Sequence, residues 1–430
     1  MLFLVPPAQV EAPPAPAPLT LDLAGALARA RAENAMIRAA KARVEERQGL
    51  ITTTRADALP QLTLIGDFTR VRDVSILNSG FGDTAAQLGF DPTALVAPRN
   101  VYTGQAVASQ PLFYWGKIGT AIDIAVMGER EAEHAYTTAE LDILHGVAKA
   151  YLAVLSAQAE LEVVEVRKRT AERFLADMKA KLEAQAATEL DRLRAESEYL
   201  AVLPESLQAE AQHQRSLEVL NGLLGLDPKT SLALGDLGLP DPNQRPTGTE
   251  RSELAQYRQQ EAMLKANERI ITSDLRPKFD FSASYGWQAG QTDNLFKTPY
   301  DTWRVNVTMR FPVFDGLRSS GKRAQNRAQL EQVRQFRIDK ERSIAVEKRS
   351  AERELEKAAA FHAAARKAYD AGNEALRMSR ESFEQGLITS LDLLQAERTE
   401  RQLESQRRRA ELALWAATFD HRRALGLPPL

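Results

Sequence analysis

Apolar residues recur in alternating steps of three and four residues downstream of Lys117, in a stretch without proline. The positions that keep this spacing are Leu141, Leu144, Ala148, Tyr151 and Leu155. The pattern is typical of a coiled coil, in which such positions face a neighbouring helix. We therefore expect an uninterrupted helix over residues 117–184, which at ~1.5 Å per residue would extend roughly 100 Å.

Shorter helices are expected on both sides of this long one. The first would run from Leu19 to about Asp57, with Thr20 as its N-terminal cap. A break over Gln185 to Glu189 would separate the long helix from a further helix that ends near Leu226. That last helix is expected to be interrupted at most by Pro204.

Other segments alternate strictly between apolar and polar residues, which predicts strands. In the first half, Leu62, Leu64 and Phe68 alternate with polar neighbours, and residues 101–113 are expected to be extended. The second half has a sharper pattern, in which one face is apolar: Phe279, Phe281, Ala283, Tyr285 and Trp287, followed by Trp303, Val305, Val307, Met309 and Phe311.

An apolar sheet face needs a cover, and lipid suits these segments. Their length of about 9 to 11 residues matches a tilted transmembrane strand, and their aromatic residues suit the interfaces of an outer-membrane barrel. Four strands cannot close such a barrel, because the smallest known have about eight, and an open sheet edge is not tolerated in lipid. We therefore expect oligomerisation, with three copies supplying twelve strands.

The second half of the chain repeats the first. Residues 188–196 return as residues 389–397, 201 positions later, with Thr, Leu, Asp, Leu, Ala and Glu in the same places. At the same spacing Pro111 matches Pro312, and residues 224–226 match residues 425–427. Ahead of the strands the spacing is 217, because the first half has the longer inter-strand loop. The chain is thus mainly α, with a duplicated unit of helix, strand, strand, long helix, turn and helix.

This repeat divides the chain into four parts. Residues 1–18 are rich in proline and alanine and are interpreted as a disordered leader or the remnant of an export signal. Residues 19–226 form the first repeat and residues 250–427 the second. The proline-rich segment 227–249 is interpreted as a linker that is too polar to be a core.

Composition narrows the function. The net charge of -2 gives no indication of a nucleic-acid partner, and the absence of cysteine excludes disulfides and thiolate chemistry. Gly80 to Ala85 match a loose dinucleotide pattern but lack its strand and helix context. His134 and His145 would lie roughly 16 Å apart along one helix, too far to share a metal. We expect no catalysis, no cofactor and no metal.

Three motifs resemble the TolC-like outer-membrane efflux proteins: the Pro-Leu-Phe-x-x-Gly-Lys passage at residues 111–117, the Pro-Val-Phe-Asp-Gly-x-Arg passage at residues 312–318, and residues 386–397. The resemblance covers about residues 19–427. It implies a homotrimer with a twelve-stranded transmembrane β-barrel in the outer membrane of a Gram-negative-type cell, continued by a twelve-helix coiled-coil tunnel in the periplasm. Such a channel is a passive duct for efflux or type I secretion.

The resemblance also assigns partners and sites. A periplasmic adaptor would open the tunnel at its helical tips, and an inner-membrane pump would supply the energy. The residues carried over as adaptor-binding tips are Gln185, Thr188, Glu189, Leu190, Gly386, Leu387, Thr389, Ser390 and Leu391. Gly386 is expected to be left-handed, and Thr389 or Ser390 to cap the next helix.

Asp392 has two interpretations that do not exclude each other. It can stabilise the start of its helix, or its three copies can form an acidic ring at the pore constriction. Gln395 stands where the family has a second ring aspartate, so this constriction would be less acidic. We expect the second tip to face the pore and the first tip to support it from outside.

The gate departs from the best-known members of the family. Ile388 replaces the expected arginine, so the salt link to Asp191 cannot form, and Phe383 replaces a closing tyrosine. These substitutions predict a gate held by packing of Phe383 and Ile388 rather than by ion pairs.

One alternative from another class is a soluble periplasmic coiled-coil scaffold in which the alternating segments form small capping sheets. Exposed aromatic strands argue against it. The cargo remains open among drugs, metal ions, lipids and a secreted polypeptide.

Overall fold

The computed structural model describes residues 19–72, 84, 87–89, 96, 98–240, 248 and 250–430. The expected leader and most of the Gly80–Ala85 segment lie outside these residues. The chain divides into two compact units. The sheet unit comprises Val44–Glu131 and Tyr257–Phe336, and the helical unit comprises Met1–Arg43, Ala132–Gln256 and Arg337–Leu430.

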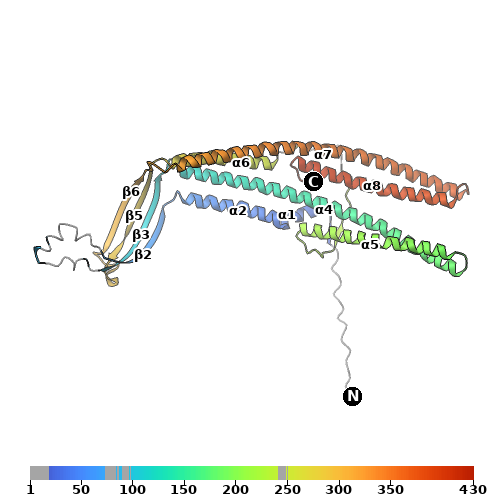
Figure 1. The fold of residues 1–430 in the computed structure, drawn as a ribbon, viewed down its shortest axis with the longest axis horizontal. Helices are drawn as coiled ribbons and strands as arrows, with labels where there is room; N and C mark the ends of the chain where they lie inside the picture. The colour runs from blue at the N-terminus through green and yellow to red at the C-terminus, as the bar shows by residue number, and fades with distance from the viewer. Residues whose placement is uncertain are drawn as a thin grey trace, which may run out of the picture. The chain divides into compact units, whose positions relative to one another are not determined.

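The sheet unit is built on four antiparallel strands in the order β2-β3-β5-β6 (Figure 1). Their bounds are Gln61–Val71 for β2, Arg99–Phe113 for β3, Lys278–Ala289 for β5 and Asp301–Arg310 for β6. All four predicted strands are confirmed, although Phe311 lies just beyond β6. Among the described residues β2 and β6 are edge strands, each paired on one side only.

The strand register separates an apolar face from a polar one. Leu64 pairs with Ala106, Ala106 with Tyr285, and Tyr285 with Trp303, so these side chains share a face. One position along, Val107 pairs with Ser284 and Thr63 on the opposite face. Because successive side chains in a strand alternate, the predicted division into two faces is confirmed for β5 and β6, whereas Ile65 of β2 and Val107 of β3 are apolar residues on the otherwise polar face.

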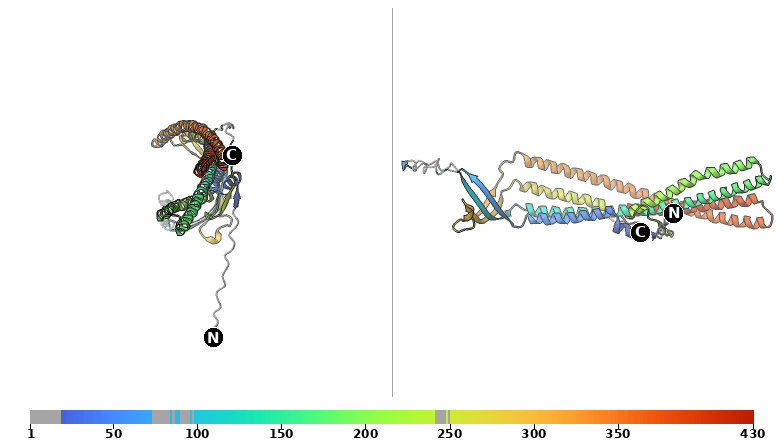
Figure 2. Two further views of the ribbon diagram at one scale, coloured as in Figure 1. Left: turned by 90° about the vertical axis from the view of Figure 1, so that its right-hand side faces the viewer. Right: turned by 90° about the horizontal axis from the view of Figure 1, so that it is seen from below.

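Two helical hairpins dominate the helical unit (Figure 2). The long helices α4 (Lys117–Glu183) and α7 (Arg318–Glu384) each have 67 residues and run without a break, as predicted for α4. A short turn leads from α4 into α5 (Glu189–Leu223) and from α7 into α8 (Ser390–Ala424). α5 continues through Pro204. No helix of the described chain combines the length and apolarity needed to cross a membrane.

The core of the helical unit gathers buried side chains from both repeats. Leu144 and Tyr151 of α4 pack with Leu220 of α5 and Phe419 of α8. The hydroxyl of Tyr151 donates a hydrogen bond to the backbone oxygen of Gly235 at 2.6 Å. This contact ties the core to the segment that joins the two repeats.

The joining segment contributes to the core, contrary to our expectation. It contains β4 (Leu232–Leu234), which pairs in parallel with β1 (Leu19–Leu21). Leu232, Leu234 and Leu237 pack against the main cluster. The segment was expected to be too polar because its prolines dominate, but a few spaced leucines are sufficient to anchor it.

The first helix is also different from the prediction. Thr20 lies in β1, and Asp22 is the cap, because its carboxylate accepts the backbone N–H of Gly25 at 2.8 Å. α1 (Leu23–Glu33) is followed by its cap Asn34, and α2 (Ala35–Ala56) begins at the next residue. In the second repeat α6 (Ser252–Ser273) corresponds to α2.

Candidate functional site

The two turns at the ends of the helical hairpins have the same backbone. Gln185 and Gly386 both adopt a left-handed conformation, with φ of 56° and 73°. The next residue in each turn bonds back across the helix end: Ala186 N donates to Lys181 O at 2.7 Å, and Leu387 N donates to Ser382 O at 2.9 Å. These bonds satisfy carbonyls that a helix end leaves free, so the predicted left-handed conformation of Gly386 at the end of the long helix is confirmed.

Each turn is followed by a capping box. The Thr389 hydroxyl accepts the backbone N–H of Asp392 at 3.3 Å, and the Asp392 carboxylate accepts the backbone N–H of Thr389 at 3.0 Å. Thr188 and Asp191 make the same reciprocal pair in the first turn. Thr389 rather than Ser390 is therefore the cap, and the capping role of Asp392 is confirmed.

Hydrogen bonds from threonine lower the pKa of both tip aspartates. The Thr389 hydroxyl is the main cause for Asp392, followed by the Thr389 backbone N–H. The Thr188 hydroxyl and backbone act on Asp191 in the same order. Because the folded pKa is depressed, the stability from these caps is present at neutral pH and is lost as acid protonates the carboxylates.

The predicted tip residues are mostly exposed. Leu190 has 56% of its surface accessible and Leu387 has 72%, so each turn presents an apolar side chain beside polar ones. Gln185, Thr188, Glu189 and Thr389 are exposed as well. An exposed leucine beside a capped turn offers apolar surface that a partner could bury.

The predicted gate and constriction residues lie in or beside the turns of the two hairpins: Asp191 at the first, and Phe383, Ile388 and Gln395 at the second. Phe383 is 41% exposed, Ile388 is half-buried, and Gln395 is exposed. Figures 1 and 2 show the α4/α5 and α7/α8 turns apart from each other, and Asp191 bonds to Thr188 within its own turn. In a single chain, therefore, Asp191 does not meet Phe383 or Ile388, and the packed gate stays a prediction.

The ion pairs that two arginines form in the hairpins were not anticipated from the sequence. Arg192 reaches both Glu189 and Glu196, at 2.6 and 2.9 Å. In the second hairpin Arg380 lies 3.5 Å from Glu397 and links the two arms. The spacing of three or four residues between Arg192 and its partners is a signal that the sequence does contain.

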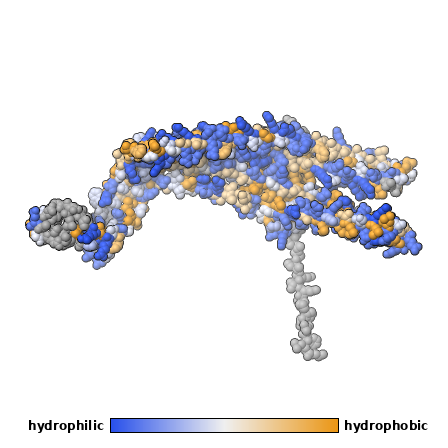
Figure 3. Space-filling view, viewed as in Figure 1, coloured by the Kyte–Doolittle hydropathy of each residue, from blue (hydrophilic) through white to orange (hydrophobic). Residues whose placement is uncertain are grey.

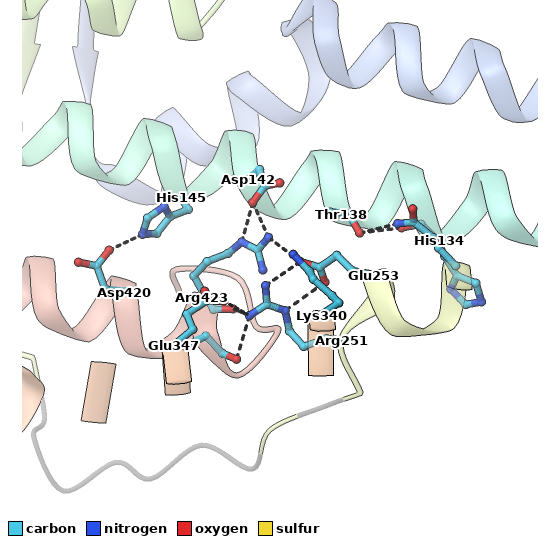
Figure 4. Close-up of polar contacts among 12 residues, drawn as sticks. His134, Thr138, Asp142, His145, Arg251, Glu253, Lys340, Glu347, Asp420 and Arg423 are labelled. Carbon is cyan, nitrogen blue, oxygen red and sulfur yellow. Dashed lines mark hydrogen bonds and ion pairs between the residues drawn. The ribbon is translucent and has the colours of Figure 1, made fainter. Parts of the chain in front are cut away.

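A charge cluster where α6 begins and α8 ends was also not anticipated from the sequence (Figure 4). Arg251, 3% exposed, donates to the backbone oxygen of Ala424 at 3.1 Å and pairs with Glu253 and Glu347 at 2.6 and 3.2 Å. Arg423 lies 3.3 Å from Glu253. Burial alone would raise the pKa of Glu253, but hydrogen bonds from Arg251 and from its own backbone N–H, together with the charges of Arg251 and Arg423, bring it down to about 2.

The histidines of α4 are not grouped with metal-binding partners. His145 Nε2 lies 2.7 Å from an Asp420 carboxylate oxygen. Over the part of the chain that the structure describes, no group of three or more His, Asp or Glu side chains is placed to hold a metal ion.

Comparison with known proteins identifies the family. The family described as "Outer membrane efflux protein" matches residues 26–226 and 249–426. The chain belongs to the outer membrane efflux protein family. Members of this family are located in the outer membrane and act in efflux and secretion, and this location holds for the present chain.

Two relatives of this outer membrane efflux protein share less than a quarter of its residues over the matched regions. The pyoverdine export outer membrane protein OpmQ of Pseudomonas aeruginosa is 24% identical over 73% of this chain, and the match spans 65% of OpmQ. The outer membrane protein TolC of Vibrio cholerae is 22% identical over 65% of this chain and 66% of its own length. The chain therefore spans slightly less than two thirds of these two relatives.

Solved structures share the fold. The CmeC outer membrane channel of Campylobacter jejuni superposes with a TM-score of 0.79 at 14% identity, covering 94% of this chain and 85% of CmeC. VceC of Vibrio cholerae gives 0.73 at 20% identity, covering 95% and 97%. The expected mainly helical, TolC-like fold is confirmed at this level. Membership of an outer-membrane family does not favour the soluble scaffold.

Proposed function

We propose that the chain is one subunit of a passive homotrimeric duct, built as a twelve-stranded barrel and a twelve-helix tunnel. The observation that supports this most is the open four-stranded sheet, with one apolar face and two edge strands paired on one side. The apolar face suits lipid and the polar face suits water. Backbone groups on the open edges need partners within a bilayer, so other copies must complete the sheet.

The helical hairpins are proposed to project into the periplasm, where a periplasmic adaptor binds their tips. The exposed Leu190 and Leu387 on capped turns support this role. An inner-membrane pump is proposed to supply the energy. Family members are channels rather than enzymes, which supports a passive role for this chain.

Family membership indicates the cargo of the channel only in broad terms. Relatives include proteins described by pyoverdine export, alkaline protease secretion and multidrug resistance. We propose that this chain conducts what its pump delivers, in an efflux or a type I secretion system.

The second tip is proposed to form the pore constriction. Three copies of Asp392 would make an acidic ring that binds polyvalent cations, with Gln395 one turn further and neutral. Hydrogen bonds from Thr389 lower the pKa of Asp392 in the single chain, which favours its charged form. Phe383 and Ile388 are proposed to close the gate by packing.

Conductance across planar bilayers tests the channel and the ring together. The purified chain should have a trimeric mass in detergent and conduct ions, and Asp392→Asn should weaken block by a polyvalent cation at least tenfold. Asn keeps an oxygen that can accept the capping bond, and Asp191→Asn makes the same change in the first turn as a control. Unchanged block in Asp392→Asn would overturn the ring, and a monomer without conductance would overturn the duct.

A further inference from the structure

The internal repeat relates contacts within one chain to contacts between chains. In β2-β3-β5-β6 the first hairpin belongs to the first repeat and the second hairpin to the second. β3 pairs with β5 across the junction of the repeats. In a closed ring of copies, β6 of one copy would meet β2 of the next across an equivalent junction. The contacts seen inside the chain therefore serve as a template for the contacts between copies.

The two spacings that relate the repeats hold residue by residue. Gln61 pairs with Ser109 in the first hairpin, and Lys278 pairs with Arg310 in the second. These pairs coincide when β2 is advanced by 217 positions and β3 by 201. The helices agree, because α7 and α8 begin and end 201 positions after α4 and α5.

We infer that the open edges complete one another in a register fixed by this repeat. Within the chain Ala106 pairs with Tyr285, and Val107 pairs with Ser284. The equivalent pairs between copies are Val307 with Phe68 and Thr308 with Asp67 of the next copy. The inference rests on the proposed trimeric duct and specifies how its subunits meet.

The proposed register between copies also pairs residues that lie on the same face of the sheet. Val307 and Phe68 both lie on the apolar face of their sheet, and Thr308 and Asp67 both lie on the polar face. A shift by one residue would place apolar side chains opposite polar ones. The repeat thus joins apolar face to apolar face across the copies.

The shifts of 201 and 217 positions that relate the repeats also predict an ion pair between copies. Lys117 and Asp274 form an ion pair of 2.7 Å where the two repeats meet inside the sheet unit. Their equivalents are Arg318 and Asp57 of the next copy. Both are exposed in the single chain, and their charges are complementary. Arginine, unlike lysine, can donate two parallel hydrogen bonds to the carboxylate.

The helical unit has a second interface between repeats, where α4 of the first meets α8 of the second. Ion pairs run along it: His145 with Asp420 at 2.7 Å, Glu160 with Arg409 at 2.7 Å, and Glu162 with Arg408 at 3.8 Å. This within-chain α4–α8 interface is therefore strongly polar on its accessible side.

The equivalents of these three ion pairs between copies are uncharged. The pairs that correspond to those three are Val346 with Val219, Phe361 with Gln208 and Ala363 with Leu207, each joining α7 of one copy to α5 of the next. The apolar members are widely exposed in the single chain: Val346 67%, Val219 55%, Phe361 57% and Leu207 68%. Figure 3 shows apolar patches over the α4/α5 hairpin. We assign this surface to a second copy of the chain.

Disulfide trapping tests the strand register in a chain that has no cysteine of its own. Thr308→Cys with Asp67→Cys joins residues that should be opposite, with Cβ atoms about 4.5–5.5 Å apart, near enough for a disulfide. Thr308→Cys with Thr63→Cys is the matched control, because Thr63 lies on the same face about 13 Å along the strand. On oxidation of the full chain in detergent, the first pair should give at least tenfold more covalent dimer and trimer.

The outcomes separate the register from the duct. Equal or stronger cross-linking of the control pair would overturn the register, as would a trimeric native mass without cross-linking of the predicted pair. A monomeric native mass in the unmodified chain would instead overturn the proposed trimer, and the register with it.

Charge insertion tests the helical interface. Val219→Asp and Val346→Lys should each lower the fraction of trimer at a fixed temperature at least tenfold, because each places an unpaired charge in a dry contact. The double variant should recover trimer by forming the ion pair that the within-chain interface uses, and Val219→Thr, which keeps the shape without charge, should stay trimeric. If both single variants keep the native trimer fraction, lipid or another protein covers this face and the assignment is overturned.

Discussion

The two repeats use different side chains to hydrogen-bond the backbone oxygen at the end of an equivalent helix. In the first, the Asn34 side chain donates to the backbone oxygen of Leu223, at the end of α5, at 2.9 Å. In the second, Arg251 donates to the backbone oxygen of Ala424, at the end of α8. The donors are 217 residues apart and the acceptors 201, so these are the same contact. A small neutral amide and a large cation thus perform equivalent capping.

The cation requires surroundings that the amide does not. Glu253 and Glu347 neutralise Arg251, whereas Met36 and Gly146 stand at the corresponding positions of the first repeat. A buried charge is tolerated only when it is paired and hydrogen-bonded. The comparison shows that duplicated units can diverge from a neutral contact to an ionic network while the backbone stays the same.

Of the variants considered, removal of the Arg251 cation should lower the free energy of unfolding most. Arg251→Met leaves Glu253 without its main partner and α8 without its cap, so the free energy of unfolding should fall by about 3–5 kcal/mol. Urea denaturation followed by circular dichroism measures it. Adding Glu253→Gln should recover part of the loss, and a loss below about 1 kcal/mol in Arg251→Met would show that the network is not needed.

Acid should weaken the second repeat through the same network. The pKa of Glu253 is about 2, below the ordinary value near 4.3 of an unfolded glutamate. A depressed pKa means that its stabilising effect is complete above the unfolded pKa and disappears as the pH falls towards 2. The difference in urea midpoint between the native chain and Glu253→Gln should therefore shrink between pH 5 and pH 2. A constant difference would contradict the assignment.

Loss of the neutral cap should cost less. Asn34→Ala removes the bonds that its side chain makes with the N–H groups of Met36 and Ile37 and with the Leu223 oxygen. We expect a loss of about 1–2 kcal/mol in the free energy of unfolding, independent of pH over the range used for Glu253. A loss as large as that of Arg251→Met would remove the contrast between the two repeats.

The smallest effect is expected at the turns. Gln185 holds a left-handed backbone that glycine adopts without cost, so Gln185→Gly should stabilise the first turn by at most about 1 kcal/mol. Gly386→Ala should destabilise the second by a similar amount. Hydrogen exchange of the amides that follow each turn measures both. If Gln185→Gly speeds exchange, Gln185 makes a contact that outweighs its backbone strain.

Sequence patterns predicted the features that depend on local repetition. The seam of Leu144 and Tyr151 marked α4 closely, and the alternation in β5 and β6 predicted both strands and their faces. The spacing from Thr389 to Asp392 is enough to predict a helix start. Such signals lie within a few residues of one another.

Features set by distant partners were missed. Asn34 accepts the N–H groups of Met36 and Ile37, which is a local capping signal, but its bond to Leu223, 189 residues away, could not be seen in any local pattern. The leucines of β4 enter the core because β1 pairs beside them. Arg251 was not singled out, although its alignment with Asn34 at a spacing of 217 was available in the sequence. The roles of Phe383 and Ile388 depend on neighbouring copies and remain predictions.

The matched lengths of the helices constrain how this chain can change over evolution. α4 and α7 both have 67 residues, and α5 and α8 both have 35. An insertion in one arm of a hairpin must be balanced in the other arm, or the two arms lose their common register. Seven-residue steps keep the apolar seam in phase. Viable length variants should therefore arise through paired insertions or deletions of whole heptads, and single-arm changes should be rare among functional descendants.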